Sequence, residues 1–383
     1  MKTRNLVRLF LSGIIILCFT PMKAGSQAPA SGDPRIATTQ VSFAVARMNH
    51  DHIGFILGRI RKGNPNYRLA GIYEPDQKLV QKYSKSYNLD ASLFYDDLEK
   101  MLDQAKPVAV LAFGSTFDHL SVVEACAPRG IHVMVEKPMA VNMDHAVKMK
   151  SLADKYKIHL LTDYETSWYP STAKAWQLVN DSSFVGILRK VVVHDGHSGP
   201  VEIGCSKEFL SWLTDPVLNG GGALTDFGCY GANLMTYLTR GMQPVSVTAV
   251  TRQFKPSVYP KVDDDAVIIV SYPESECIIQ ASWNWPFSRK DMEIYGASGY
   301  VMADNNYDMR QKAGNQKIEL KRKITAGDVG VYEDPFSYFA GVIDGTVRMM
   351  DFDPYSPENN MMVVKILDAA RESARTGKTI KFR

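Results

Sequence analysis

Short apolar segments alternate with amphipathic ones between residues 40 and 163, and this alternation constrains the fold more than any other feature. The apolar runs, rich in Val, Ile and Leu, occupy residues 41–46, 69–73, 108–113, 133–135 and 159–161. Stretches with helical spacing lie between them, at 53–61, 77–87, 119–127 and 143–156. Apolar strands separated by helices are typical of a parallel sheet that helices cover on both faces. We therefore predict an α/β, doubly wound domain over residues 36–163, with its ligand at the carboxyl ends of the strands.

The pattern changes after residue 163. Strand-like runs with polar alternation lie at 188–193, 245–251, 266–271, 277–283 and 292–295, and helices are expected at 172–179, 207–213, 227–238 and 335–349. Closely spaced alternating strands predict an α+β domain over residues 164–350 with a large, mostly antiparallel open sheet. A last helix, within 355–383, is marked by Ser356-Pro357-Glu358 at its start and Gly377 after its end. We expect this helix to return to the first domain.

The N-terminus has the pattern of a signal peptide. Three basic residues precede an uncharged run over residues 9–22, which is too short for the roughly 20 residues that span a bilayer. We predict a signal peptide at 1–28 and an exported, periplasmic protein without a membrane span in its mature form. The alternative is a buried N-terminal helix. Leu17 fits poorly before a lipoprotein cysteine, which argues against anchoring through Cys18.

Charge excludes two classes of partner. The formal charge is +3, but four bases and no acid lie in residues 1–26, so the remaining chain carries −1 without a long run of either sign. A nucleic-acid or anionic-membrane binder is therefore not expected. After processing, Cys126, Cys205, Cys229 and Cys277 remain, widely separated in the sequence. We expect buried thiols, although export permits disulfides.

The first strand is followed by a turn without the glycines of a dinucleotide fingerprint. Residues 46–54 read ARMNHDHIG where G-x-G-x-x-G would be usual. Asn49 and Asp51 nevertheless suit turns and helix caps, and a helix N-terminus offers N–H groups to a phosphate. Glu74 ends the second strand, where a carboxylate would bind ribose hydroxyls and favour NAD over NADP. The alternative for Glu74 is an ordinary surface residue before Pro75.

Several segments together resemble one family. Residues 130–140 (GIHVMVEKPMA) form a strand, then Glu-Lys-Pro, then a helix. They resemble the signature of the Gfo/Idh/MocA family of sugar oxidoreductases. Similar family segments follow in order: 220–230 (GGGALTDFGCY), 263–266 (DDDA), the strand ending at Trp283, 294–299 (IYGASG) and the terminal helix. The resemblance covers nearly the whole mature chain, and residues 49–53 resemble a glycine-poor variant of the family's first turn.

The resemblance implies an N-terminal Rossmann domain that binds NAD, with NADP possible, and a homodimer or homotetramer formed through the open sheet. It places the cofactor at Met48, Asn49, His50, Glu74, Ser115, His119, Glu136 and Lys137. It also implies catalysis by Lys137, Asp226 and Tyr230. The family often has His at the position of Tyr230, and a phenol can exchange a proton only if a cation such as Lys137 lowers its pKa. The alternatives are Asp226 as a helix N-cap and Tyr230 as a packed ring.

A carbohydrate substrate is expected to meet Lys137, Asp226, Tyr230, Trp168 and His197. Trp168 could stack on a sugar ring or pack in the core. His194 and His197 would face opposite sides of a strand, and no cluster of ligating residues has metal spacing, so no metal is expected.

Three functions remain open. The first is an NAD(P)-dependent oxidoreductase acting on a hydroxyl of a sugar, cyclitol or glycoside. The second is a redox-neutral glycosidase, lyase or epimerase that retains NAD, and the third is a non-catalytic carbohydrate-binding protein. An exported enzyme meets no pool of dissolved NAD, so we expect a tightly held cofactor. The presence of Lys137, Asp226 and Tyr230 argues against the binding protein.

Overall fold

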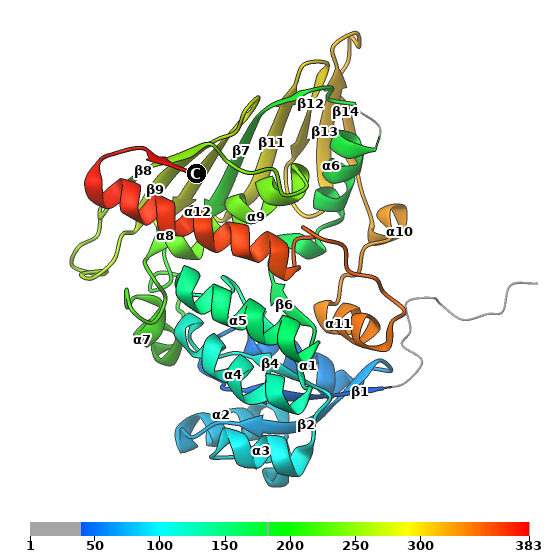
Figure 1. The fold of residues 1–383 in the computed structure, drawn as a ribbon, viewed down its shortest axis with the longest axis vertical. Coiled ribbons are helices and arrows are strands. Elements are labelled where there is room, and N and C mark those ends of the chain that lie inside the picture. The colour runs from blue at the N-terminus through cyan, green and yellow to red at the C-terminus, as the bar shows by residue number, and fades with distance from the viewer. Residues whose placement is uncertain (1–39, 182–183, 383) are drawn as a thin grey trace, which may run out of the picture. The chain divides into compact units, whose positions relative to one another are not determined.

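The first half of the chain forms a parallel sheet (Figure 1). The computed structural model describes residues 40–181 and 184–382, and the predicted signal peptide lies outside them. The strands are β1 (Val41–Ala46), β2 (Tyr67–Tyr73), β3 (Phe94–Tyr95), β4 (Ala109–Ala112), β5 (His132–Glu136) and β6 (Leu160–Asp163). Their order, β3-β2-β1-β4-β5-β6 with every pair parallel, is that of a Rossmann domain. The predicted doubly wound sheet is therefore confirmed, and only the short edge strand β3 escaped prediction.

Helices cover both faces of this sheet. They are α1 (Ile53–Lys62), α2 (Gln77–Tyr87), α3 (Leu98–Ala105), α4 (His119–Cys126) and α5 (Met143–Tyr156). Side chains of a strand point alternately to its two faces. Phe43 and Val45 of β1 accordingly join a core with α1 and α2, whereas Ala44 and Ala46 join a core with α3, α4 and α5. This two-sided burial explains the unbroken apolar sequence of β1.

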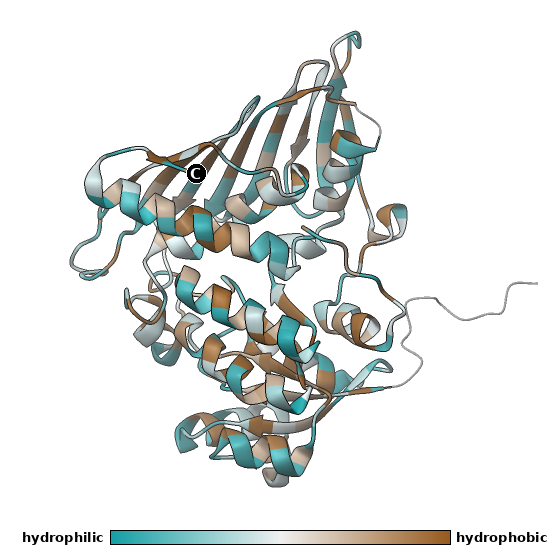
Figure 2. Cartoon of the chain, in the orientation of Figure 1, coloured by the Kyte–Doolittle hydropathy of each residue, from teal (hydrophilic) through white to brown (hydrophobic). Residues whose placement is uncertain are grey.

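The second half of the chain contains a nine-stranded sheet. Its strands are β7 (Leu188–Gly196), β8 (Ser246–Arg252), β9 (Asp265–Ser271), β10 (Glu276–Ser282), β11 (Arg289–Gly296), β12 (Gly299–Ala303), β13 (Asp308–Ala313), β14 (Leu320–Lys323) and β15 (Ile380–Lys381). The order is β14-β13-β12-β11-β7-β10-β9-β8-β15, and β7 with β10 is the parallel pair in an otherwise antiparallel arrangement. Figure 2 shows bands of hydrophobic and hydrophilic residues alternating along these strands. The predicted open sheet is confirmed, although β12 to β15 were not predicted.

Helices of the second half are α6 (Pro170–Asn180), α7 (Lys207–Leu213), α8 (Ala223–Asp226), α9 (Gly228–Leu238), α10 (Ala326–Val329), α11 (Pro335–Asp344) and α12 (Pro357–Thr376). Helices α9 and α12 pack together and cover one face of the sheet (Figure 1). Ser356 caps α12 by accepting the N–H of Asn359, and Gly377 ends the helix in the left-handed conformation, as the sequence predicts. Helix α11 ends at Asp344 and not at residue 349, because Gly345 adopts a φ of 79°.

Two late segments pack across the predicted domain boundary. Phe339 of α11 stacks on Phe43 of β1, with ring centroids 5.7 Å apart, so α11 belongs to the core of the parallel sheet. Helix α12 lies mainly on α9 and β8 and also contacts α5. The boundaries at residues 163 and 350 therefore stay predictions.

The remaining expectations concern cysteines and membranes. Cys126, Cys229 and Cys277 are buried thiols, as predicted, and Cys205 is a half-buried thiol. In the part of the chain that the structure describes, no helix has both the length and the apolarity to cross a bilayer.

Candidate active site

Lys137 and Asp226 form a buried ion pair between the two halves of the chain. Lys137 follows β5, before a cis bond to Pro138, and its Nζ bonds to the Asp226 carboxylate and, at 3.2 Å, to the Asp226 carbonyl oxygen. The second carboxylate oxygen accepts the indole N–H of Trp283 at 2.9 Å. Only 7% of each charged side chain is exposed. Asp226 ends α8 and is not the cap of α9, so the alternative of a helix N-cap is wrong.

Each partner fixes the charge of the other. Burial alone would lower the pKa of Lys137, but the adjacent Asp226 carboxylate raises it above the ordinary value. Burial would likewise raise the pKa of Asp226, but Lys137 lowers it below the ordinary value. The site therefore presents a permanent ammonium and a permanent carboxylate at neutral pH.

Tyr230 lies beside this pair. Its ring centroid is 5.4 Å from Lys137 Nζ, and its hydroxyl accepts a bond of 3.5 Å from Lys290. The expectation that a cation lowers the pKa of Tyr230 is wrong. Burial, reinforced by the Glu165 carboxylate, raises this pKa well above the ordinary value. The three predicted catalytic residues are thus brought together, but the phenol is a poor proton acceptor.

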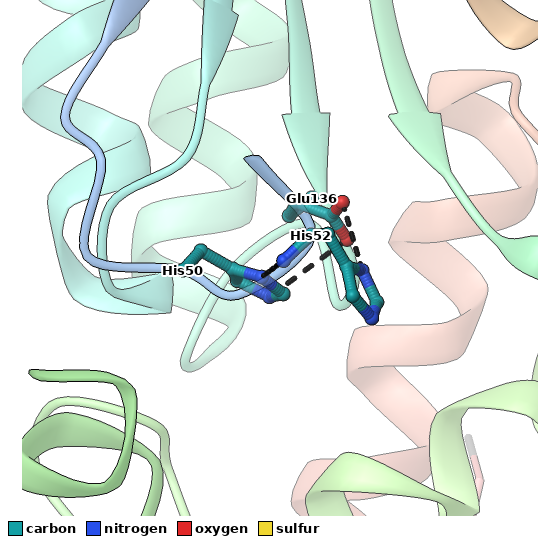
Figure 3. A group of neighbouring side chains, drawn as sticks. All are labelled: His50, His52 and Glu136. Atoms are coloured by element: carbon teal, nitrogen blue, oxygen red, sulfur yellow. Dashed lines mark hydrogen bonds and ion pairs between the residues drawn. The ribbon is translucent and has the colours of Figure 1, made fainter. Parts of the chain in front are cut away.

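Glu136 faces the opposite way from its neighbour Lys137. Figure 3 shows Glu136 at the end of β5, directed toward His50 and His52 on the turn after β1. His52 Nδ1 lies 3.1 Å from one carboxylate oxygen, and His50 Nε2 lies 3.9 Å from the other. Burial would raise the pKa of Glu136, but His52, His50 and Lys137 together lower it. An ionised carboxylate thus sits between two imidazoles.

His50, His52 and Glu136 could together bind a metal ion, because their donor atoms lie within 4.8 Å of one another. Sequence spacing did not reveal the group, because Glu136 joins it from another strand. The backbone N–H of His52 donates to His50 Nδ1 at 3.1 Å. Burial lowers the pKa of His50 well below the ordinary value, so its ring is neutral. The proton of a neutral ring must then sit on Nε2, which leaves no lone pair there for a metal.

The turn after β1 holds the other predicted cofactor residues. The Met48 N–H donates to Glu74 at 2.7 Å, and the other Glu74 oxygen accepts the N–H of Asp76 at 3.0 Å. Glu74 is fully buried, so it is not an ordinary surface residue. The Asp51 carboxylate accepts the N–H of Ser206, and neither it nor Asn49 caps α1, whose cap position is His52.

Polar atoms without partners test whether the site suits a dinucleotide. In the described chain, Arg47 Nε, Asn49 Oδ1 and His119 Nε2 are buried and make no hydrogen bond. Arg47 and Asn49 follow β1, and His119 opens α4 with its Nδ1 bonded to the Met139 carbonyl. Buried polar atoms need partners, and these lie where the Rossmann fold places pyrophosphate and nicotinamide. Ser115, also predicted, is committed to capping the turn before α4. The residues present therefore fit the cofactor.

Residues 206–219 lie over the carboxyl ends of the strands of the parallel sheet. The indole N–H of Trp212 donates to the Asn49 carbonyl at 3.0 Å, and the N–H of Phe117 donates to the Leu218 carbonyl at 2.9 Å. The His50 ring packs against Phe209 and Trp212, with centroids 4.6 and 5.3 Å away. We call this segment the cover.

A cavity of about 210 Å³, here called the aromatic cavity, opens beside the ends of β5 and β6. Its wall includes Phe55, Phe113, Trp168, Phe336 and Tyr230, together with His52, Glu136 and Asp163. Trp168 stacks on Tyr355 at 5.1 Å and donates to Asp163 at 2.6 Å. It is therefore packed in the core and also lines the cavity, and its stacking on a sugar ring stays a prediction.

His197 lies in a second, polar cavity of about 700 Å³ on the nine-stranded sheet. Its Nδ1 accepts the N–H of Gly199, and its ring packs edge-on against Phe227. His194 instead bonds to Asp291 at 3.0 Å. Glu165 and Tyr169 line both cavities, so the two spaces adjoin there.

Sequence comparisons agree with this geometry. Residues 52–164 match the family described as "Oxidoreductase family, NAD-binding Rossmann fold", and residues 172–302 match the GFO/IDH/MocA C-terminal domain. The chain belongs to the Gfo/Idh/MocA family of oxidoreductases. The predicted family is therefore confirmed, and the first half of the chain is the family's NAD-binding domain.

Relatives and solved structures extend this result. D-xylose 1-dehydrogenase [NADP(+)] of Haloarcula marismortui is 22% identical over 69% of this chain and 71% of its own length. The rhizopine catabolism protein MocA of Rhizobium meliloti is 26% identical over 55% of this chain and 63% of its own. An inositol dehydrogenase homologue from Azotobacter vinelandii, solved with NAD+, superposes with a TM-score of 0.78 at 16% identity, over 90% of this chain and 98% of its own.

Sequence reasoning missed two features of the site. His52 was passed over because its partner Glu136 is distant in sequence. The sequence did contain one indication of this contact. His50 and His52 lie in a turn where glycines are usual, and imidazoles in such a turn call for a hydrogen-bond partner. The cover was predicted as a helix at 207–213, but nothing in its sequence indicated that it packs on the turn after β1.

Proposed function

We propose that this protein is an exported, NAD(P)-dependent oxidoreductase that acts on a hydroxyl of a sugar, cyclitol or glycoside. The observation that carries the proposal is the buried Lys137–Asp226 pair at the carboxyl end of β5, with Tyr230 beside it. The named activity of the D-xylose 1-dehydrogenase relative supports a sugar-like substrate.

The chain's own residues bind the dinucleotide and stabilise charge on the substrate. Arg47, Asn49 and His119 would hold the dinucleotide through the polar atoms that otherwise lack partners. NAD(P), when bound, supplies a hydride acceptor for the carbinol carbon. Lys137 stabilises negative charge that develops on the substrate oxygen, and Asp226 keeps the ammonium charged and in place. Tyr230 forms a wall of the aromatic cavity and contacts the substrate.

Nucleotide measurements on the purified protein test this proposal. We expect mass analysis of the denatured protein to release NAD or NADP. We also expect reduction of the nucleotide when a panel of aldoses and cyclitols, including D-xylose and myo-inositol, is added. Absence of bound nucleotide together with no binding on titration would overturn the proposal. A Lys137→Met variant that turns over at the wild-type rate would contradict the assigned role of the ammonium.

A retained cofactor is the second part of the proposal, and it keeps the redox-neutral alternative open. The cover supports it, because the bonds of Trp212, Ser206 and Phe117 hold this segment over the edge of the sheet where the dinucleotide would lie. Removing the indole N–H in Trp212→Phe loses one hydrogen bond, worth about 1 kcal/mol. We expect bound nucleotide to exchange several-fold faster, as measured by dilution into labelled NAD. An unchanged rate would mean that the cover does not control release.

Export and assembly complete the proposal. We propose cleavage of the signal peptide at 1–28 and a homodimer or homotetramer formed through the open sheet. The mass of the secreted protein and its size in light scattering test these two points. An intact N-terminus or a monomer would contradict them.

A further inference from the structure

His52 has the geometry of a general base. Its Nδ1 lies 3.1 Å from the Glu136 carboxylate, and 34% of its side chain is exposed. It forms part of the wall of the aromatic cavity. Figure 3 shows its other ring nitrogen directed away from Glu136, and no hydrogen bond within the described residues engages that atom.

Glu136 selects the tautomer that a base requires. Only 4% of Glu136 is exposed, and a desolvated carboxylate attracts a proton-bearing nitrogen strongly. Nδ1 of His52 therefore carries the ring proton, which leaves a lone pair on Nε2. An imidazole held by a carboxylate on one nitrogen and open on the other is the arrangement of catalytic bases.

The remaining groups of the cavity are less suited to accept a proton. The Tyr230 phenol is held protonated by burial and by Glu165. Burial and the nearby Glu136 raise the pKa of Asp163, which already accepts the indole N–H of Trp168. Glu165 is committed to Lys290 and Tyr169. Glu333 also lines the cavity, but it is exposed and accepts the Tyr307 hydroxyl at 3.3 Å. Among the buried and half-buried groups named here, the His52 imidazole is the uncommitted acceptor.

We propose that His52 is the catalytic base of this protein, positioned by Glu136, for a hydroxyl of a polyol ring bound in the aromatic cavity. This inference rests on the proposed function. The O–H bond breaks, its proton passes to His52 Nε2, and its electron pair forms the C=O bond. The electrons of the carbinol C–H bond would leave as hydride, for which NAD(P), when bound, would supply the acceptor. The imidazolium then releases its proton to water, which restores the base.

The aromatic walls indicate the class of substrate. Phe55, Phe113 and Phe336 supply flat apolar surfaces for the C–H face of a ring, and Asp163 supplies an oxygen for a hydroxyl. The volume of about 210 Å³ suits a single ring and not an oligosaccharide.

The first experiment measures the tautomer and needs no substrate. In protein labelled with ¹⁵N-histidine, His119 and His194, whose Nδ1 atoms also bond to oxygens, should give signals of a protonated Nδ1 beside that of His52. The signal that vanishes in His52→Gln should be that of a ring with a protonated Nδ1 and a free Nε2. Glu136→Gln should shift the ring toward the Nε2–H form. A wild-type His52 protonated on Nε2 would overturn the proposal, whatever the outcome for nucleotide binding.

The second experiment measures turnover with the panel polyol that reduces NAD+ fastest. We expect His52→Ala to lower kcat about 100-fold or more, to leave NAD+ affinity within about three-fold, and to regain rate with added imidazole. His159→Gln, at a remote imidazole, is the matched control and should match wild type. A kcat within three-fold of wild type in His52→Ala, or activity lost to a chelator and restored by zinc, would overturn the assignment. If no polyol reduces NAD+, the proposed function fails, and the NMR result alone decides the state of His52.

Discussion

Two buried carboxylates, Glu136 and Asp226, lie on either side of one short motif and have different partners. Glu136 faces two imidazoles on the turn after β1, whereas Asp226 faces an ammonium and an indole from other elements. Both have pKa values below the ordinary range, yet burial alone would raise both. Their charges therefore depend on the particular partners that surround each of them.

The difference follows from the direction of adjacent side chains. Glu136 and Lys137 are consecutive, and the alternation along an extended chain sends one toward the Rossmann turn and the other toward α8. One Glu-Lys-Pro segment thus serves two neighbouring sites. The Lys137 side carries a buried ion pair, and the Glu136 side ends in the half-buried imidazole of His52.

The largest expected effect comes from breaking the Lys137–Asp226 pair. Lys137→Met leaves Asp226 as an unpaired buried charge, so we expect the free energy of unfolding to fall by about 3–5 kcal/mol. The double variant Lys137→Met, Asp226→Asn should regain most of that loss but no activity. Urea unfolding of both variants checks this, and a double variant no more stable than the single one would contradict it.

A smaller effect distinguishes Asp163 from the two ionised carboxylates. Burial and Glu136 raise the folded pKa of Asp163, whereas the unfolded value is about 3.9. The folded chain therefore binds the extra proton, and stability falls as pH rises from about 4 through the raised pKa. Asp163→Asn keeps an acceptor for Trp168 and removes this loss. At pH 8 we expect the free energy of unfolding of Asp163→Asn to exceed that of wild type by at least about 1 kcal/mol. At pH 4 we expect no such gain. Equal differences at both pH values in thermal melts would contradict this cause.

The smallest expected effect concerns Tyr230. Its hydroxyl has only a long bond of 3.5 Å from Lys290, and its raised pKa makes it a poor base. We expect Tyr230→Phe to lower kcat less than about ten-fold, which is about 1.4 kcal/mol. Steady-state kinetics beside His52→Ala provides the comparison. A loss of kcat as large as that of His52→Ala would indicate that the Tyr230 phenol, and not His52, exchanges the proton.

The sequence predicts the fold well where local patterns decide it. Helices α2 and α5 and strand β1 have the predicted bounds, because each has a complete period of apolar residues and clear end signals. Strands β12 to β14 were missed, and the reason is plain for β14, which is the edge strand of the sheet. All four residues of β14 are exposed there, so alternation carries no signal.

The candidate site could be predicted only in part, and for a related reason. The Glu-Lys-Pro segment and Asp226 could be found because they belong to recognisable motifs. The pairing of His52 with Glu136 could not be found, because it depends on the order of strands β1, β4 and β5 in space. The raised pKa of Tyr230 likewise depends on burial by distant elements, which no local pattern reports.

The stacking of Phe339 on Phe43 has a consequence for synthesis. The first strand emerges from the ribosome long before α11, and until then Phe43 lacks the ring that closes its core. A chain truncated after β6 would leave that aromatic surface open to water, which favours association with chaperones or other chains. The core of the Rossmann half is thus expected to close only when α11, which lies in the last fifth of the polypeptide, has been made.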